Sequence, residues 1–416
     1  MYLKAKKRLI YSSISNKIHY IFQRLTRIMI NFWNKHFWLL AMANLLLVMS
    51  SYMLIATIPL CMEVRGYTML QIALVMGVFF IGIYLFGSLS GYLVQRYRRK
   101  NVFNVSTLLL LAVTGVLYYL SNLPYHSFDY TLLVGLRFIQ GAFYGLSQLV
   151  LLSTLIIDTV EAVHRTEANH AATWFGRFAL SFGPLAGIMV YQTMNFASVL
   201  LLSCICVAVS FIFVNLIRFP FRMPSEDFSR FSCDRFLLKG SHWLFVNVTL
   251  ITSVVGLLLS IEHSPRFYGM LMVGFIIAIL AERFVFADAD LRSEATTGMI
   301  VIGIAILLMI TRNQESVSYI VPILIGLGVG LIGSRFLLFF IKMSDHCQRG
   351  TSQSTFLLAW ETGIGVGLVL SYGVFNLELP LILWIGLGIL AVSLILYDTF
   401  IHVTKCLILL GMQPSR

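Results

Sequence analysis

The chain alternates long apolar stretches with short polar turns over most of its length. Each stretch is close to the roughly 20 residues that an α-helix needs to cross a bilayer. Twelve of them lie at about 37–60, 72–94, 102–121, 130–157, 171–190, 197–217, 242–261, 266–282, 297–311, 319–341, 353–375 and 380–401. The pattern predicts an all-α membrane protein with twelve transmembrane helices.

The longest polar break, residues 218–241, separates the first six apolar stretches from the last six. It contains two prolines, five cations and three acids. We therefore expect two six-helix bundles on either side of a central loop. The expected units are a basic arm at 1–36, bundles at 37–217 and 242–401, the loop at 218–241 and a tail at 402–416.

Composition and charge placement support this prediction. Hydrophobic residues make up 58% of the chain and charged residues 12%, whereas soluble domains carry about 25% charged residues. The net charge of +12 does not indicate a nucleic-acid partner, because the even-numbered turns and the two tails hold 24 of the 30 Lys and Arg residues. The positive-inside rule then places both termini and the central loop in the cytoplasm, with the chain in the lipid bilayer of the inner (cytoplasmic) membrane.

The two halves of the sequence repeat each other weakly. Gly87, Leu93 and Arg96 correspond to Gly274, Leu280 and Arg283 at an offset of 187 residues. At an offset of 184 residues, Arg165 corresponds to Arg349 and Gly183 to Gly367. Because the identities fall at equivalent turns, they indicate two parallel repeats of six helices related by pseudo-symmetry.

A short basic turn between the second and third spans carries a recognisable motif. It reads Gly91-x-Leu93-x-Gln95-Arg96-x-x-Arg99-Lys100, with glutamine and Arg98 where the family pattern has aspartate and glycine. Apart from these two positions it resembles the loop between helices 2 and 3 of the major facilitator superfamily, whose members are secondary transporters.

The resemblance implies a cytoplasmic gate and a mechanism. In the family, an acid at the end of span 4 pairs with arginines of this loop, so Asp158 is expected to pair with Arg96 or Arg99. The internal repeat adds Arg283 to the expected gate, together with Gly91 and Lys100. The resemblance also implies a cavity lined by spans 1, 4, 7 and 10, which opens to either side as one bundle rocks against the other.

Span 4 places four polar residues on one helical face: Arg137, Gln140, Tyr144 and Gln148. A charge inside a membrane helix faces protein or water, and is therefore a candidate functional residue. Arg137-x-x-Gln140-Gly141 also resembles a span 4 motif that the superfamily associates with proton-coupled carriers. The alternative is a structural arginine that binds helix carbonyls.

Span 5 contains Gly183-Pro184-x-x-Gly187, which resembles the glycine–proline motif of superfamily antiporters. Proline removes one backbone hydrogen bond, and small residues permit a bend and close packing. An alternative of similar weight is a packing kink with no bearing on the direction of transport.

The internal repeat singles out one further pair. Arg177 and Glu361 lie at the same repeat position, twelve residues after Arg165 and Arg349, and Glu361 is the only acid well inside a predicted span. Since burial disfavours a charged carboxylate, Glu361 suits a proton carrier near neutral pH. We expect Arg177 and Glu361 to approach each other in one transport state, unless each is satisfied within its own bundle. The turn of the second half that is equivalent to the 87–100 loop carries Glu282, Arg283, Asp288, Asp290, Arg292 and Glu294, which are interpreted mainly as solvated turn charges.

The expected cavity suits a small, moderately apolar or weakly anionic organic molecule. Span 1 contributes Asn44, Ser51 and Tyr52, and span 7 contributes Asn247, Thr249 and Thr252. Export by proton antiport is the first expectation, and uptake of a nutrient or organic anion by proton symport is the second. A non-transporting sensor or a membrane enzyme is a third.

Motifs for other chemistries are not found. The six cysteines form no C-x-x-C pair, the histidines show no metal-ligand spacing, and no phosphate-binding loop indicates ATP as an energy source. We expect a monomer without cofactor or metal, whose partners are its substrate, protons and lipid. The arm is either an interfacial amphipathic helix, or lies before a translation start at Met29.

The predicted topology can be tested directly. Cysteine reporters at residue 126 and after residue 405 are expected to react from opposite sides of the membrane, because the first site lies in an odd-numbered turn and the second in a cytoplasmic tail. Labelling of both reporters from one side would show that the span count is wrong.

Overall fold

The structure is a computed structural model that describes residues 34–122, 129–161, 164–219, 236–286, 291–312, 314–344 and 348–401. Within these ranges every regular element is a helix. The expectations for the tail, for most of the central loop and for nearly all of the basic arm fall on residues outside these ranges.

The first half of the chain forms six crossings. They are α2 (Lys35–Val64), α3 with α4 (Met69–Ile83 and Gly87–Arg96), α5 (Arg99–Ser121), α6 with η2 and α7 (Tyr130–Val150, Leu151–Leu155 and Ile156–Asp158), α8 (Arg165–Thr193) and α9 (Phe196–Asn215). Two crossings are interrupted: α3 ends one turn before α4 begins, and the five-residue π-helical segment η2 continues α6. Such π-helical insertions are common at functional sites.

The second half repeats this count. Its crossings are α10 (His242–Ile261), α11 (Pro265–Phe284), α12 (Leu291–Thr311), α13 (Glu315–Lys342), α14 (Arg349–Gly373) and α15 with η5 (Leu379–Leu396 and Tyr397–Ile401). Eleven of the twelve crossings in the described ranges are long and apolar enough to span a membrane. The twelfth is α8, whose buried polar residues include Asn169, Thr173, Arg177 and Ser181. The predicted all-α fold with twelve helices is confirmed.

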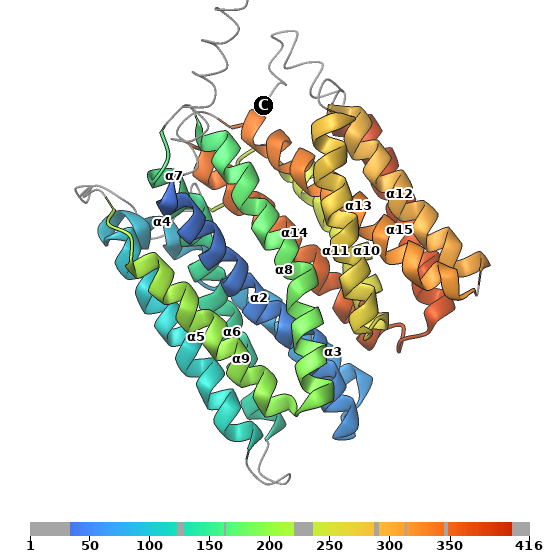
Figure 1. The fold of residues 1–416 in the computed structure, drawn as a ribbon, viewed down its shortest axis with the longest axis horizontal. Coiled ribbons are helices and arrows are strands. Elements are labelled where there is room, and N and C mark those ends of the chain that lie inside the picture. Colours follow the sequence, from blue (N-terminus) through green and yellow to red (C-terminus); the bar gives the residue numbers. More distant parts are fainter. Residues whose placement is uncertain are drawn as a thin grey trace, which may run out of the picture.

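Helix packing follows the internal repeat (Figure 1). In the first bundle α2 packs on α8 and α9, α3 on α6, and α5 on α6 and α9. In the second bundle the equivalent helices make the same contacts: α10 packs on α14 and α15, α11 on α13, and α12 on α13 and α15. The bundles meet where α3 packs on α14 and where α8 packs on α11, which are again equivalent pairs. The contacts therefore display the pseudo-symmetry that the sequence offsets predict.

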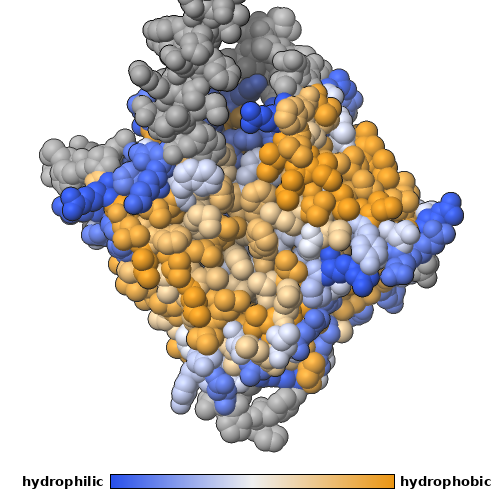
Figure 2. All heavy atoms as spheres, in the orientation of Figure 1, coloured by the Kyte–Doolittle hydropathy of each residue, from blue (hydrophilic) through white to orange (hydrophobic). Residues whose placement is uncertain are grey.

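Apolar side chains cover the flanks of both bundles, and hydrophilic residues gather toward the ends (Figure 2). Exposed residues on the flanks include Leu201, Ile205 and Ile212 on α9, and Trp384 and Ile395 on α15. This distribution fits a protein whose sides face lipid. The end that carries Arg96, Arg99, Arg165 and Arg349 is called the basic end below.

Glycines allow the helices within each bundle to touch through their backbones. A Cβ atom at Gly141 on α6 would overlap the carbonyl oxygen of Phe79 on α3. At the equivalent contact in the second bundle, a Cβ atom at Gly274 on α11 would overlap the carbonyl oxygen of Ile323 on α13. Such close approach is typical of membrane helices, because dispersion contacts rather than the hydrophobic effect hold them together.

We expect Gly141→Ala to lower the thermal unfolding midpoint of the detergent-purified protein by several degrees, because overpacking costs about 1–3 kcal/mol. Gly135→Ala is the matched control, since a Cβ atom at that position of α6 meets no atom within 4 Å. Equal midpoints for the two variants would contradict the close α3–α6 contact.

Candidate functional site

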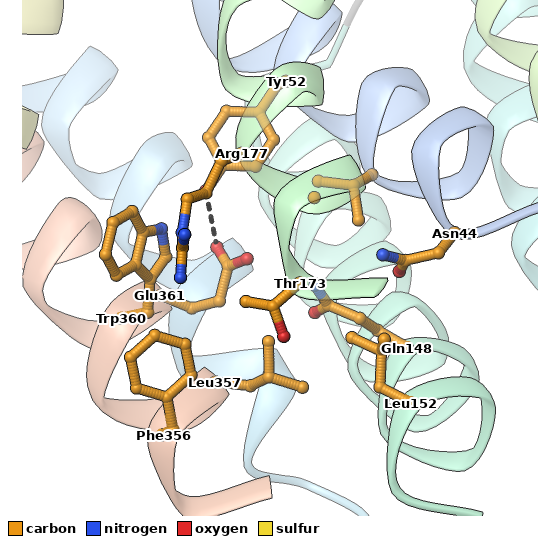
Figure 3. Close-up of a pocket in the computed structure, with 12 residues that line it drawn as sticks. Asn44, Tyr52, Gln148, Leu152, Thr173, Arg177, Phe356, Leu357, Trp360 and Glu361 are labelled. Atoms are coloured by element: carbon orange, nitrogen blue, oxygen red, sulfur yellow. Dashed lines mark hydrogen bonds between the residues drawn. The ribbon is translucent and has the colours of Figure 1, made fainter. Parts of the chain in front are cut away.

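A small cavity lies between the two bundles near their middle (Figure 3). Its volume is about 30 Å³, enough for no more than a few waters. The lining residues come from four crossings and include Asn44, Val48, Tyr52, Gln148, Leu152, Thr173, Arg177, Phe356, Leu357, Trp360 and Glu361. The structure thus brings together five predicted site residues: Asn44 and Tyr52 on span 1, Gln148 on span 4, Arg177 on span 5 and Glu361 on span 11.

The expected contribution of spans 7 and 10 to this cavity is wrong for this structure. Asn247 on α10 donates to the carbonyl oxygen of Ser393 on α15 at 2.7 Å, and Thr249 donates to the carbonyl oxygen of Ala359 on α14 at 3.3 Å. These polar groups therefore join helices inside the second bundle. Spans 5 and 11 take their place, because α8 and α14 lie at the interface between the bundles.

Glu361 is the centre of the cavity's hydrogen bonding. The hydroxyl of Tyr52 on α2 donates to its Oε2 at 3.3 Å, as the dashed line in Figure 3 marks, and the hydroxyl of Tyr144 on α6 donates to its Oε1 at 3.3 Å. Gln148, one turn after Tyr144, also donates to the carboxylate. Only 3% of Glu361 is exposed. Its partners all belong to the first bundle, so these bonds cross the interface between the bundles.

Arg177 lines the same cavity from α8 but does not pair with Glu361. Its guanidinium lies 4.5 Å from the ring centroid of Trp174, and Nη1 donates weakly to the carbonyl oxygen of Gly330 on α13 at 3.5 Å. Among the described residues, Nε and Nη2 of this buried side chain have no hydrogen-bond partner. The approach of Arg177 to Glu361 in another transport state stays a prediction.

The predicted polar face of span 4 is buried throughout, but its residues divide between two tasks. Tyr144 and Gln148 reach Glu361, whereas Arg137 donates to the Oε1 of Gln140 at 2.6 Å. Gln140 in turn donates to the hydroxyl of Thr114 on α5 at 3.0 Å. Arg137 also stacks on Phe79, with 4.4 Å from its Cζ to the ring centroid. Arg137 therefore lies inside the first bundle and does not line the central cavity.

The glycine–proline motif positions α8 against α2. A Cβ atom at Gly183 would lie 2.8 Å from the Cβ of Tyr52, and one at Gly187 would lie 3.1 Å from the Cα of Met53. α8 continues through Pro184 to Thr193 without a break. The motif thus allows the close contact that places Tyr52 beside Glu361.

At the basic end, the structure selects one of the two candidate partners of Asp158. Arg99 forms an ion pair with Asp158, while Arg96 is exposed. Lys100 donates instead to the carbonyl oxygens of Asn215 and Ile217, which end α9. Arg283 is exposed on α11.

Gly91, Arg99 and Asp158 share a second, larger cavity. Its volume is about 340 Å³, and Arg165 and Arg349 also line it. The cavity lies at the basic end of the interface, where η2 meets the start of α14. Of the predicted gate residues, Gly91, Arg99 and Asp158 therefore line this cavity. Lys100, Arg96 and Arg283 do not line it.

The interpretation of Glu282 and Glu294 as solvated turn charges is wrong. Glu282 on α11 lies against His170 on α8 across the bundle interface, with 3.0 Å between Nε2 and Oε1. Glu294 is fully buried on α12 and pairs with Arg335 on α13. The sequence contained one signal for this pairing. Arg335 lies inside a predicted span, and a charge there needs a counter-ion, which Glu294 could have been expected to supply. Asp288 and Asp290 lie outside the described residues.

Comparisons with known proteins agree with this architecture. The sequence profile of the Major Facilitator Superfamily matches residues 40–286, more than half of the chain. No curated protein sequence matches the chain.

Solved structures similar to this one are transporters. The human organic anion transporter MFSD10 is 13% identical with a TM-score of 0.67, over 86% of this chain and 98% of that one. A mutant of the nucleoside transporter NupG is 12% identical with a TM-score of 0.64, over 88% of this chain and 100% of that one. A bacterial homologue of the iron transporter ferroportin is 14% identical with a TM-score of 0.62, over 88% of this chain and 99% of that one. At these identities the likeness shows the fold alone.

We expect Arg99→Gln to loosen the basic end, because it removes the ion pair between Arg99 and the largely buried carboxylate of Asp158. The rate at which a cysteine introduced at Ser153, which lines the larger cavity, reacts with a maleimide should rise severalfold. Arg96→Gln is the matched control, since Arg96 is exposed. A faster reaction in the control, or an unchanged rate in Arg99→Gln, would assign the gate to other residues.

Proposed function

The chain belongs to the Major Facilitator Superfamily, and from this we propose that it is a secondary active transporter that exports a small organic molecule in exchange for protons. Alternating access arises as the two bundles rock about the central cavity. In this proposal Glu361 carries the proton, and the cavity around it binds the substrate.

One observation carries the proposal: a buried carboxylate of one bundle is held by hydroxyl groups of the other. Tyr52 and Tyr144 both donate to Glu361 across the interface. Hydrogen bonds to an ionised acceptor are roughly twice as strong as those between neutral groups. Protonation of Glu361 therefore weakens the link between the bundles and favours their separation, which couples proton binding to the change in access.

Glu361 also gives a reason for the exchange of substrate against protons. A carboxylate that holds a proton no longer attracts a cationic group of a substrate, so the two ligands compete for Glu361. A carrier that changes access with either ligand bound, but never with both, exchanges one for the other. This competition favours antiport as the proposed mode.

Uptake of an organic anion by symport is the second candidate, and it would gain support from an anion site at Arg137. That side chain is fully buried, donates to Gln140 and does not line the central cavity. These contacts suit a structural role inside the first bundle. We therefore retain export as the proposed direction.

The names of the structural neighbours do not select a substrate, since nucleoside, organic anion and iron transporters share this fold. The substrate therefore has to be identified by experiment. Metabolite and drug accumulation in cells with and without the protein would identify candidates. Flux in proteoliposomes would then separate a transporter from a sensor or a membrane enzyme. We propose that the protein acts as a monomer, in which the cavity lies between the two bundles of one chain.

With a substrate in hand, Glu361→Gln is expected to abolish flux driven by an imposed proton gradient, a loss of at least tenfold. The variant cannot release or take up a proton at that position, whereas exchange of labelled for unlabelled substrate should continue. Glu378→Gln is the control, since this glutamate is exposed at the start of α15. Undiminished proton-driven accumulation in Glu361→Gln would make Glu361 structural and move coupling to other residues.

A further inference from the structure

Arg177 is a buried cation with unused hydrogen-bond donors. It is 3% exposed, and its Nε and Nη2 have no partner among the described residues. Gly333 makes room for the guanidinium against α13, since a Cβ atom at that position would lie 2.5 Å from Nε. Leaving donors of a buried charge without hydrogen bonds has a free-energy cost. A group that satisfies these donors in the transport cycle would recover that cost.

The acids near Arg177 are engaged elsewhere. Glu282 and Glu294 influence Arg177 electrostatically, but Glu282 is bound to His170, and Glu294 to Arg335. Their negative charges stabilise the Arg177 cation from a distance, but neither acid forms a hydrogen bond with its Nε or Nη2. Those donors remain available to a carboxylate or another oxyanion, for which the planar guanidinium is the preferred partner.

Glu361 presents the complementary case. The groups that donate to it, two tyrosine hydroxyls and the amide of Gln148, are neutral. Among the described residues no cation lies within ion-pair distance of its carboxylate. The cavity thus has a cation on α8 and a carboxylate on α14, and neither neutralises the other (Figure 3).

Apart from Arg177 and Glu361, the cavity lining is mostly apolar. It also contains one hydrogen-bond acceptor without a partner among the described residues, on Asn44. Tyr52, Phe356 and Trp360 provide aromatic surface. Asn44 donates to the carbonyl oxygen of Ala172 at 3.1 Å, and its buried Oδ1 has no partner among the described residues. An ammonium group has three donors and would find acceptors in Glu361 and Asn44.

We propose that this cavity, once it widens as the two bundles rock apart, binds a small zwitterion, with its oxyanion on Arg177, its ammonium group on Glu361 and an apolar remainder against the aromatic residues. The inference names the substrate class of the transporter proposed above and rests on that function. A purely anionic ligand would leave Glu361 without a cation, and a purely cationic one would leave Arg177 without an anion. Only a ligand with both charges satisfies both, which is how unpaired charges reject the wrong partner. The ammonium group also supplies the competitor of the proton at Glu361.

The test compares matched ligands on the full-length protein in detergent. L-phenylalanine, 3-phenylpropionate and phenethylamine share one ring and differ in whether they carry both charges, the anion or the cation. L-alanine and L-leucine vary the apolar remainder. At 10 mM ligand and pH 7, at least one of the three amino acids is expected to raise the unfolding midpoint by several degrees, because a ligand that binds only the folded state stabilises it. The two singly charged compounds are expected to shift it by less than one degree.

Variants then assign the two contacts. Arg177→Gln should weaken amino-acid binding at least tenfold and remove the preference over phenethylamine. Glu361→Gln should remove the preference over 3-phenylpropionate. Arg266→Gln is the control, because Arg266 is about half exposed, pairs with exposed Glu315 and stacks on Tyr319, away from the cavity. The ligand comparison on the unmodified protein decides the question even if a variant fails to fold.

An equal shift with 3-phenylpropionate would show an anion site, and an equal shift with phenethylamine a cation site; either result overturns the inference. So does the absence of a shift with all three amino acids. If a different substrate is nevertheless transported with protons, only the substrate class fails. If the amino acids bind but Glu361→Gln keeps its proton-driven flux, the zwitterion site stands and the proposed coupling role fails.

Discussion

The hydrogen bonds between Glu361 and the tyrosine hydroxyls of the opposite bundle are the interaction on which the centre of this protein depends. A carboxylate in the middle of a membrane protein is shielded from bulk water, so protein groups must supply most of its donors. Here the donors come from α2 and α6, and the acceptor from α14. The two bundles are therefore joined at the depth where a transporter has to open and close.

The surrounding packing serves to bring these three helices together. Backbone contact at Gly183 and Gly187 holds α8 against α2 and fixes the position of Tyr52, while Gly141 and Gly145 draw α6 against α3. α3 in turn packs on α14. Close helix contacts through small residues are the main source of cohesion between membrane helices. The same glycines that stabilise each bundle therefore also determine how near the tyrosines come to the carboxylate.

Charge is compensated differently at the basic end and at the centre. Toward the basic end three described acids that are largely shielded from solvent have basic partners: Asp158 has Arg99, Glu282 has His170 and Glu294 has Arg335. At the centre, the equivalent positions of the repeat hold Arg177 and Glu361, which line one cavity without pairing. Paired charges hold the structure together, whereas charges left unpaired beside a cavity are available for ligands and protons.

The helical fold, the number of crossings, the internal repeat and the two charged residues of the cavity, Arg177 and Glu361, could be predicted from the sequence. These properties follow from local hydrophobicity and from the rarity of charge inside an apolar stretch, which singles out Arg137, Arg177 and Glu361 without any knowledge of contacts. The partners of those charges could not be read in this way. Tyr52 and Tyr144 lie 309 and 217 positions from Glu361, and helical periodicity gives the face of a residue but not the helix that covers it.

Which of two chemically similar residues forms a buried ion pair depends on how the helices pack. Arg96 and Arg99 are both cations of one turn, but α5 begins at Arg99 and carries it toward Asp158, whereas Arg96 ends α4 facing solvent. Glu294 was interpreted as a turn residue because α12 begins six residues earlier than the apolar stretch predicts, at Leu291. Its pairing with Arg335 depends on how α12 packs on α13. Long-range packing makes these choices, because it determines which buried charges come within reach of one another.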